Sequence, residues 1–331
     1  DQVLGALRLF ERDELTDIAA LTAEAARACL DLARRETWTL MPGYTHLQRA
    51  VPQTVGHWAA AFAEGFTESG RVLVGARGAC DASPLGAAAG YGVNLPLDRE
   101  GVAHELGFTR VATNPLWSQT SRGMTEVVVL AAVWHAVAVA RRLAWDLSLF
   151  TTAEFGFVTL PVDLTTGASI MPNKRNPDIV ELVRASCSVV EGAMVELMSL
   201  SSLPSGYHRD LQLTKAPVMR ALAEARGILA AIVRVVPSLQ LAREKMAAAV
   251  TEDTLATDRA VELARSGLPF REAYRRVAAE VGSADVPAGD AAGASVRART
   301  SLGAAGNLEL DRIGHSLDRL SEDISRSPSS S

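Results

Sequence analysis

Lysine is scarce in this 331-residue sequence, in which only three of the 33 basic residues are not arginine. The formal net charge is −5, and no run of five or more basic residues occurs. Nucleic acids and anionic membrane surfaces are bound through clustered positive charge, so we expect neither as a partner. A small or mildly acidic ligand suits this composition better.

Long hydrophobic runs are absent as well. The longest covers the fourteen residues 127–140 and is interrupted by His135, whereas a helix that crosses a bilayer needs about 18 to 20 apolar residues. We therefore predict a buried helix here and no membrane span. The opening residues, DQVLGALRLFERDEL, lack a basic segment followed by an apolar one. No export signal is visible, and a cytoplasmic location is expected.

Cysteine provides no framework for the fold. The three cysteines, Cys29, Cys80 and Cys187, are odd in number and far apart, and each lies among alanines or valines. This setting suits small buried hydrophobic side chains, so we expect no disulfide and no metal site. The sequence also shows no phosphate-binding glycine loop, no nucleophile elbow and no cluster of His, Cys and Asp at metal spacing. None of these three kinds of site is therefore predicted from the motifs.

What the chain does have is helical periodicity over long windows. Apolar residues recur at helical spacing, while strand-like alternation is scarce. A helix of about 25 to 30 residues is about 40 Å long. We therefore predict an all-α fold, an elongated bundle of long antiparallel helices. The windows are 3–36, 53–80, 120–150, 178–203 and 210–236.

The pattern changes after Pro237, where the helical segments become shorter. We predict a central helical bundle domain over residues 1–236, a small C-terminal helical domain over 237–303, and a tail over 304–331. The tail contains a short amphipathic helix, because its apolar residues fall on one face, and ends in a disordered SRSPSSS segment. The residues of that face are Leu310, Ile313, Leu317, Leu320 and Ile324.

Two segments, residues 127–140 and 228–236, are apolar nearly all round. A single layer of five helices would leave part of their apolar surface in water. Association of subunits would cover that surface. We therefore predict a homo-oligomer with the long helices at its centre.

The stretch TTGASIMPNKRNPDIVELVRA, residues 165–185, carries one of the rare lysines, Lys174. Asn176, Pro177 and Asp178 predict a helix start, with Asn176 as the N-cap residue. An ammonium beside the free N–H groups of a helix N-terminus favours anions, and lysine offers a compact charge where arginine presents a broad fork. The stretch thus predicts an anion pocket, the alternative being a solvated loop lysine.

Two other groups of polar residues lie in or beside loops. His46 follows Thr45 in the segment GYTHLQ, where a histidine can act as an acid or a base near neutral pH. Tyr207 precedes another long helix, and Gln212 and Lys215 lie on one face at its start. An exposed polar helix start explains this second group equally well.

The segment GASIMPNKRNPD, residues 167–178, resembles the signature of the fumarase/aspartase superfamily. That signature reads Gly-Ser-Ser, an apolar residue, Met-Pro, any residue, Lys, any residue and Asn-Pro. Further segments, MPGYTHLQRAVPQTVGHW, EFGFVTLP, GYHRDLQLTK and LPFREAY, are more similar to the argininosuccinate lyases than to adenylosuccinate lyases, fumarases or aspartases. The likeness covers residues 1–281.

The resemblance implies an all-helical homotetramer in which the central helices of four subunits form one bundle and each active site uses loops from three chains. It also implies a substrate and a reaction. Argininosuccinate loses a proton from the carbon next to a carboxylate and then expels arginine, leaving fumarate. Cations and N–H donors directed at that carboxylate lower the barrier to carbanion formation. No metal or organic cofactor is implied.

Residues of this chain match site positions of the family. Lys174 and Asn176 match residues that stabilise the carbanion. Thr45 and His46 match a substrate-contacting pair, with His46 a candidate acid or proton relay and Glu181 its orienting carboxylate. The positions that hold the substrate in the family correspond here to Tyr207, Gln212 and Lys215.

Two departures from the family predict impaired chemistry. The proton-abstracting serine is replaced by Ala168, whose methyl group cannot take a proton, and Ser169 matches the second serine of the pair. Either the chain was altered to trap substrate, or it is a naturally weak or inactive homologue, or Ser169 has taken over as the base. Loss of a general base lowers a rate by about 10²- to 10⁴-fold. The family also carries an N-terminal domain that ends in a substrate-contacting Ser-Arg-Asn before the position of Asp1, and we expect that domain to be absent here.

Two alternatives to an argininosuccinate lyase stay open at the level of sequence. One is another fumarate-producing lyase of the superfamily, such as an adenylosuccinate lyase-like enzyme. The other is a non-catalytic structural homologue.

Overall fold

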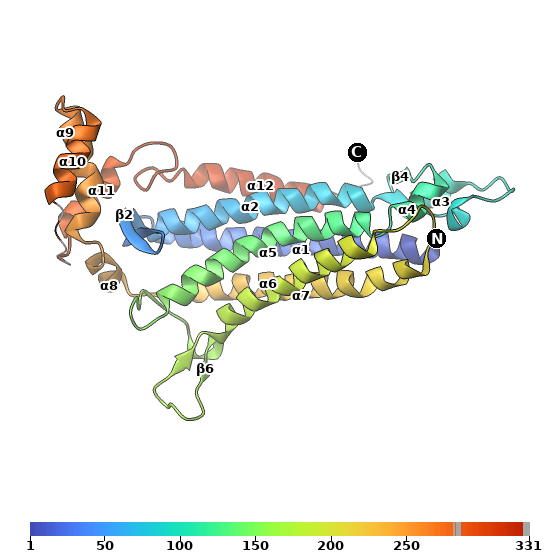
Figure 1. Cartoon of the computed structure of the whole chain (residues 1–331), viewed down its shortest axis with the longest axis horizontal. Helices are drawn as coiled ribbons and strands as arrows, with labels where there is room; N and C mark the ends of the chain where they lie inside the picture. The colour runs from blue at the N-terminus through green and yellow to red at the C-terminus, as the bar shows by residue number, and fades with distance from the viewer. Residues whose placement is uncertain (281, 283–285, 327–331) are drawn as a thin grey trace.

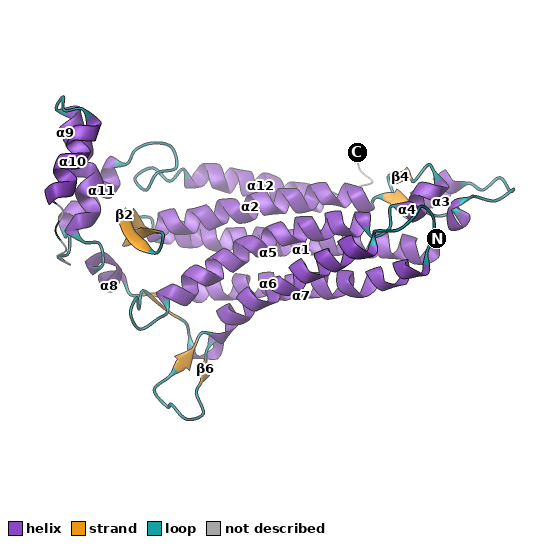
Figure 2. Ribbon diagram, viewed as in Figure 1, coloured by secondary structure: helices purple, strands orange, loops and turns teal. Residues whose placement is uncertain are grey.

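A computed structural model describes residues 1–280, 282 and 286–326 of the chain, and most of them lie in helices (Figure 2). Five long helices run side by side along the longest axis of the molecule (Figure 1). Each predicted window overlaps one of them over most of its length, so the predicted all-α bundle is confirmed. They are α1 (Gln2–Arg35), α2 (Val55–Cys80), α5 (Met124–Phe150), α6 (Asp178–Leu200) and α7 (Lys215–Ser238).

The helices pack through faces made mainly of leucine, valine and alanine. α1 contacts α2 and α7, while α5 contacts α2, α6 and α7. Along α1, Leu15, Ile18 and Ala19 are fully buried at helical spacing. Burying one leucine or isoleucine side chain contributes about 1.5 to 3 kcal/mol, and alanine lets neighbouring helices approach closely. The periodic apolar face is therefore what makes each segment a stable helix of the bundle.

The helix α5 is the most apolar of the long helices. By length and composition alone it could cross a membrane, and among the described residues it is the only helix of this kind. Half of its most apolar window is buried inside the chain. Its residues Val129, Val133 and Val137 are completely buried against the neighbouring helices. This packing agrees with the buried helix predicted for residues 127–140.

Short elements connect the helices at both ends of the bundle. At one end the antiparallel hairpin of β1 (Leu40–Thr45) and β2 (Gln48–Thr54) joins α1 to α2. We call this the hairpin end. At the same end, β5 (Val158–Thr159) pairs with β8 (Gln240–Leu241), and β6 (Thr166–Gly167) pairs with β7 (Arg175–Asn176) (Figure 1).

The opposite end, which holds the N-terminus, contains the connection between α2 and α5 and the turn between α6 and α7 (Figure 1). We call it the N-terminal end. Its short elements are η1 (Ala88–Gly90), α3 (Arg99–Glu105), α4 (Pro115–Thr120), η3 (Arg209–Thr214) and the parallel pair of β3 (Ala82–Ser83) and β4 (Arg110–Val111). One further short helix, η2 (Val162–Leu164), lies between β5 and β6.

The segment after α7 first forms short helices beyond the hairpin end and then returns along the bundle (Figure 1). The short helices are α8 (Arg243–Ala248), η4 (Glu252–Leu255), α9 (Ala256–Arg265), α10 (Phe270–Glu280) and α11 (Asp290–Ala298). The returning helix α12 (Leu310–Ser325) lies against α1 and α2, where Leu317 and Leu320 join the hydrophobic core. The domain boundaries at 236 and 303 stay predictions. The segment predicted to be disordered starts at Ser325, which instead is the last residue of α12; from residue 327 onward that segment lies outside the described residues.

The start of α6 differs from the prediction. Asn176 was expected to be its N-cap residue, but α6 begins at Asp178 with Pro177 at the capping position and no side-chain cap. The backbone of Asn176 is paired instead with that of Thr166 in the β6–β7 ladder. The hydroxyl of Thr166 donates a hydrogen bond to the Asp178 carboxylate. A local strand pair thus replaces the predicted cap.

Two glycines of α2 provide a matched test of the packing between α2 and α12. A Cβ atom at the buried Gly70 would overlap the buried side chain of Leu320, whereas a Cβ at the exposed Gly75 would meet no atom within 4 Å. We expect Gly75→Ala to raise the free energy of unfolding by up to about 1 kcal/mol through helix propensity. Gly70→Ala should lower it by about 1 to 2 kcal/mol, because overpacking outweighs that gain.

Urea unfolding of both variants at one protein concentration measures the difference. Equal stabilisation by the two substitutions would show that α12 is not packed on α2 as described.

Candidate active site

The nine residues selected from the sequence fall into two groups at opposite ends of the bundle. Thr45 and His46 lie at the hairpin end, as do the β6–β7 loop and the first turn of α6, while Tyr207 begins the second group at the N-terminal end. The two groups are separated by the length of α7, whose 24 residues span about 36 Å. One chain therefore does not bring the nine residues together.

The first group includes the tip of the β1–β2 hairpin. Thr45 pairs with Gln48, so His46 and Leu47 form a two-residue turn, with φ angles of 54° and 59°. Such turns favour Asn-Gly, because both central residues need positive φ. The side chains from Thr45 to Gln48 are exposed, while Met41 is buried in the core and Tyr44 packs on Phe155 at 5.4 Å between ring centroids. The hairpin thus holds His46 away from its own chain.

Lys174 lies in the loop 168–174, which joins β6 to β7 just before α6. Its backbone N–H donates to the carbonyl of Met171 at 3.0 Å, and its side chain is exposed. The position before a helix agrees with the prediction. The predicted anion pocket, however, is not closed by residues of the same chain.

Of the remaining hairpin-end residues, Ser169 and Glu181 are also open to solvent, while Asn176 is half-buried. Ser169 is exposed, whereas Ala168 beside it is half-buried. Glu181 is exposed on the first turn of α6. Within the described chain it forms no hydrogen bond with His46, so the predicted role of Glu181 in orienting His46 stays a prediction.

The second group does come together within the chain. The side-chain amide of Gln212 donates to the hydroxyl of Tyr207 at 2.6 Å. The Lys215 ammonium donates to the side-chain oxygen of Gln212 at 2.9 Å and to its carbonyl at 3.1 Å. Hydrogen bonds from Gln212 and Arg209 lower the pKa of Tyr207. The predicted common face of Gln212 and Lys215 is confirmed.

A residue that the sequence did not point to lies beneath this second group. The guanidinium carbon of Arg122 is 5.4 Å from the centre of the Tyr207 ring, and Arg122 is only 6% exposed. Arg122 is one of many arginines in the chain and belongs to none of the recognised motifs. No signal in the sequence distinguishes it, because its contact with Tyr207 joins residues 85 positions apart.

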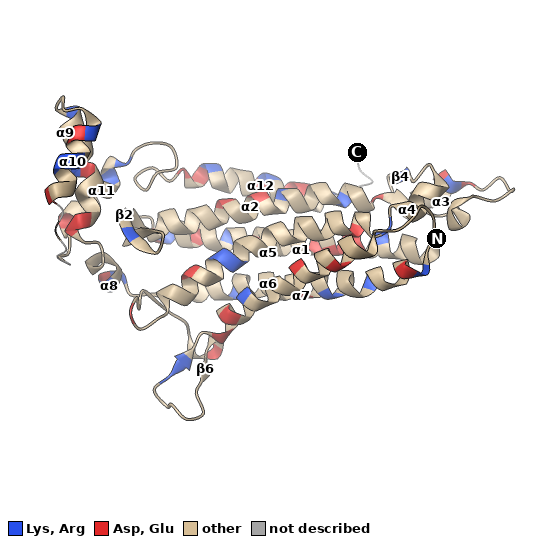
Figure 3. Cartoon of the chain, viewed as in Figure 1, with Lys and Arg blue, Asp and Glu red and all other residues tan. Residues whose placement is uncertain are grey.

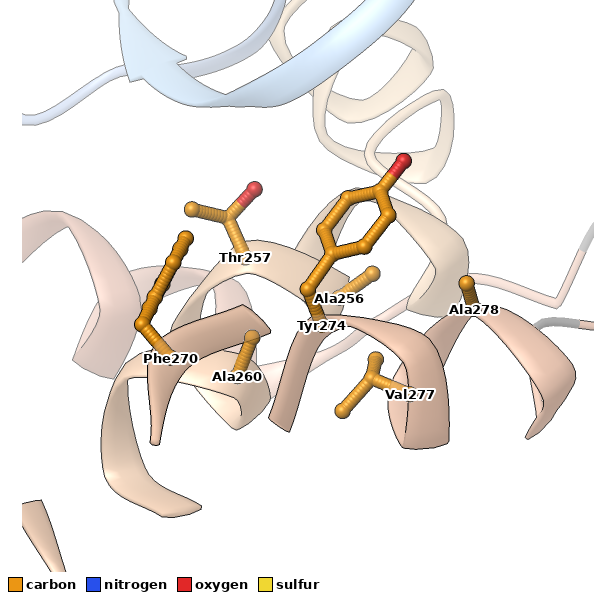
Figure 4. A pocket seen from close by; sticks show the side chains of 7 residues that line it. All are labelled: Ala256, Thr257, Ala260, Phe270, Tyr274, Val277 and Ala278. Atoms are coloured by element: carbon orange, nitrogen blue, oxygen red, sulfur yellow. The ribbon is translucent and has the colours of Figure 1, made fainter. Parts of the chain in front are cut away.

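Other features of the surface lie away from both groups. Basic and acidic residues are interspersed along the helices in Figure 3. A cavity of about 470 Å³ lies between α9 and α10, where Figure 4 shows Phe270 and Tyr274 beside Thr257 and Ala260. None of the nine residues lines it. Among the described residues, no group of three or more His, Cys, Asp or Glu is placed to hold a metal ion.

An elongated helical bundle with its polar site residues on loops at both ends is the architecture of the fumarase/aspartase superfamily, and the comparisons agree. The model of a lyase family matches residues 1–192. An EDDS lyase variant with bound fumarate has a TM-score of 0.86 over 97% of this chain and 71% of that chain, at 22% identity.

Curated relatives define the membership more closely. An argininosuccinate lyase of Sorangium cellulosum is 62% identical over 319 residues, which are 96% of this chain and 74% of that relative. One of Stenotrophomonas maltophilia is 47% identical over 313 residues, 95% of this chain and 72% of the relative. The chain belongs to the argininosuccinate lyase family, whose members are carbon–nitrogen lyases. The resemblance inferred from the sequence motifs is confirmed.

The strained turn at the hairpin tip leads to a stability prediction. Leu47 is 70% exposed and adopts positive φ, a conformation that costs residues with a Cβ about 1 to 2 kcal/mol. We expect Leu47→Gly to be more stable to urea than Leu47→Ala by about 1 kcal/mol, since the two differ only in the Cβ atom. A Leu47→Ala protein that is as stable as Leu47→Gly would contradict the positive φ at this position.

Proposed function

We propose that this chain catalyses the reversible elimination of arginine from argininosuccinate, leaving fumarate, as a cytoplasmic homotetramer. The observation that carries the proposal is the placement of two lysines that match the family's site positions. Lys174 is exposed and Lys215 is half-buried, and they lie at opposite ends of the α6–α7 pair, where neighbouring chains can reach them. The 62% identity to an argininosuccinate lyase supports this substrate over adenylosuccinate.

The proposed chemistry starts at the carbon next to a substrate carboxylate. A base removes the proton from this carbon, and the negative charge spreads onto the carboxylate. The compact ammonium of Lys174 and the polar groups of Asn176 stabilise that charge. The electron pair then forms the double bond of fumarate while the C–N bond breaks. His46, oriented by Glu181 of another chain, supplies the proton that the leaving guanidinium nitrogen takes up.

The proposed site lacks the residue that acts as the base in the family. Ala168 occupies the position of the family's base, and its methyl group cannot accept a proton. Ser169 carries a hydroxyl, but it is one residue away, and its side chain is exposed where that of Ala168 is half-buried. We therefore propose that the chain binds substrate, through Thr45 and the Tyr207 group among others, and eliminates slowly. The reaction requires neither a metal ion nor an organic cofactor.

Exposed apolar side chains on the outer helices support the proposed tetramer. Trp145 on α5 is 52% exposed, and Leu182 on α6 is 65% exposed. Exposed patches of large apolar side chains are typical of subunit interfaces. Antiparallel neighbours that pack through these helices would bring the hairpin end of one chain beside the N-terminal end of another. That arrangement would unite Lys174 with Lys215.

Restoring the missing hydroxyl tests the proposed reaction. We expect Ala168→Ser to increase fumarate release from argininosuccinate by about 10²- to 10⁴-fold, the usual contribution of a general base. Ultraviolet absorbance of fumarate measures the rate, and Ser169→Ala in the same background is the matched control. It should change the rate little.

The same assay separates the alternatives. Fumarate from adenylosuccinate but not from argininosuccinate would identify a different lyase. A tetrameric Ala168→Ser protein that releases fumarate from neither substrate would support a non-catalytic homologue. An unaltered rate in Ala168→Ser with a loss in Ser169→Ala would show that Ser169 is the base.

Mixing two inactive variants tests whether chains share a site. In the Ala168→Ser background, Lys174→Met and Lys215→Met should each be nearly inactive. Co-expressed in equal amounts they should regain up to about a quarter of the parent rate, because random assembly gives that fraction of sites both lysines. Lys174→Met mixed with Asn176→Ala is the control. It should regain nothing, since both residues lie in one segment of the same chain, and recovery there would contradict the proposed sharing.

A further inference from the structure

Arg122 occupies an unusual place between the hydrophobic core and the proposed substrate site. It directly precedes Gly123 and α5, and only 6% of its surface is exposed. Its guanidinium carbon lies 5.4 Å from the centroid of the half-exposed Tyr207 ring. A cation at this distance from an aromatic face is attracted by it, and more strongly where water is excluded. The contact therefore links a buried charge to a residue of the site.

The guanidinium is poorly paired on its other sides. Its Nη1 donates to the side-chain oxygen of Gln119 at a long 3.4 Å, and its Nε has no hydrogen-bond partner within the described part of the chain. Burial lowers the pKa of Arg122, and attraction by Glu126 opposes this effect. A buried guanidinium without a close carboxylate partner is destabilising. The stability of the fold therefore does not explain why an arginine occupies this position.

The backbone around Arg122 is nonetheless held firmly. The buried carboxylate of Glu126 accepts the N–H of Gly123 at 2.6 Å, which fixes the turn that follows Arg122. On the preceding side, the hydroxyl of Ser121 accepts a hydrogen bond from the buried Arg8 at 3.3 Å. These hydrogen bonds fix the chain on both sides of Arg122.

On the outer side of the Tyr207 ring the polar groups continue to the surface. The Tyr207 hydroxyl accepts from Gln212, and Gln212 accepts from Lys215. The ring is therefore held by a cation beneath its face and by an amide at its hydroxyl. These contacts form one continuous series from the buried Arg122 to the Lys215 ammonium.

We propose that Arg122 is a positioning residue for the substrate: it holds the Tyr207 ring so that the phenol, Gln212 and Lys215 act as one unit that receives a substrate carboxylate. This inference rests on the proposed function, because the carboxylate belongs to the substrate named there. Arg122 acts through Tyr207 and does not touch the substrate. Its positive charge also favours an anion above the ring.

The contact itself is tested without reference to activity. The chain has four tyrosines, so 3-fluorotyrosine labelling gives four fluorine resonances, which single Tyr→Phe variants assign. The charged or polar groups that act on Tyr207 are Gln212, Arg209 and Arg122. We expect Arg122→Met to raise the pKa of Tyr207 and to shift its resonance, with little change at the other three tyrosines. Arg122→Lys should retain most of the native titration.

The effect on substrate binding is measured by calorimetric titration with argininosuccinate of the chain that retains Ala168. Because Ala168 cannot act as a base, the substrate should stay intact during the titration. Arg122→Met should weaken binding by about tenfold, and Arg122→Lys by clearly less. In the Ala168→Ser background, the loss should appear in KM, with kcat little changed. A purely structural role would instead lower the fraction of folded protein and leave the KM of the folded fraction unchanged.

The results that would overturn the inference are distinct. An unchanged Tyr207 titration in Arg122→Met would show that the cation does not hold the ring. A changed titration with native affinity for argininosuccinate would show that the position of the ring is irrelevant to binding. If the unaltered chain does not bind argininosuccinate, the proposed function is wrong, and the positioning of a substrate by Arg122 is wrong with it. The fluorine spectra then still report whether Arg122 holds the ring.

Discussion

The length and stiffness of the helices constrain everything else in this molecule. A side chain reaches only a few ångströms, whereas α7 alone spans about 36 Å. Residues at the hairpin end and residues at the N-terminal end therefore cannot meet within one chain. Any site that needs both Lys174 and Lys215 must be built from more than one copy. The exposed apolar surface of the outer helices and the outward-held hairpin tip fit this requirement.

The two ends of the bundle hold their site residues in different ways. At the N-terminal end, Tyr207, Gln212 and Lys215 are already joined by hydrogen bonds and lie above a buried arginine. At the hairpin end, His46 and Lys174 are exposed on a strained turn and a loop. One part of the site, at the N-terminal end, is already formed within a chain, while the other part, at the hairpin end, is open. This difference suits a site that is completed when chains assemble. The substrate would then be held by the ordered half while the exposed groups supply the acid and the stabilising charge.

The sequence is sufficient to predict the long helices, because their buried faces repeat at helical spacing over many turns. The window 120–150 begins too early because Gly123, at a positive φ of 84°, breaks the helix before α5 starts. The expected cap at Asn176 is wrong because pairing of β6 with β7 depends on residues ten positions apart. Local capping rules do not take such pairing into account.

The site was predictable only in part for the same reason. Motifs identify Lys174, His46 and Tyr207, because a lysine among arginines and a histidine in a loop can be recognised from the sequence alone. The positive φ of Leu47 and the cation beneath Tyr207 are set by tertiary structure, and no nearby residue signals them. The family assignment, confirmed by a relative at 62% identity, indicates the chemistry. It does not show which parts of a complete site one chain lacks.

Crystals of the unaltered protein soaked with argininosuccinate provide the most direct measurement of where the site lies. The account predicts electron density for an intact ligand that contacts Lys174 of one chain and Lys215 of a second. Density for a ligand bound entirely by one chain, or bound away from both lysines, would contradict it.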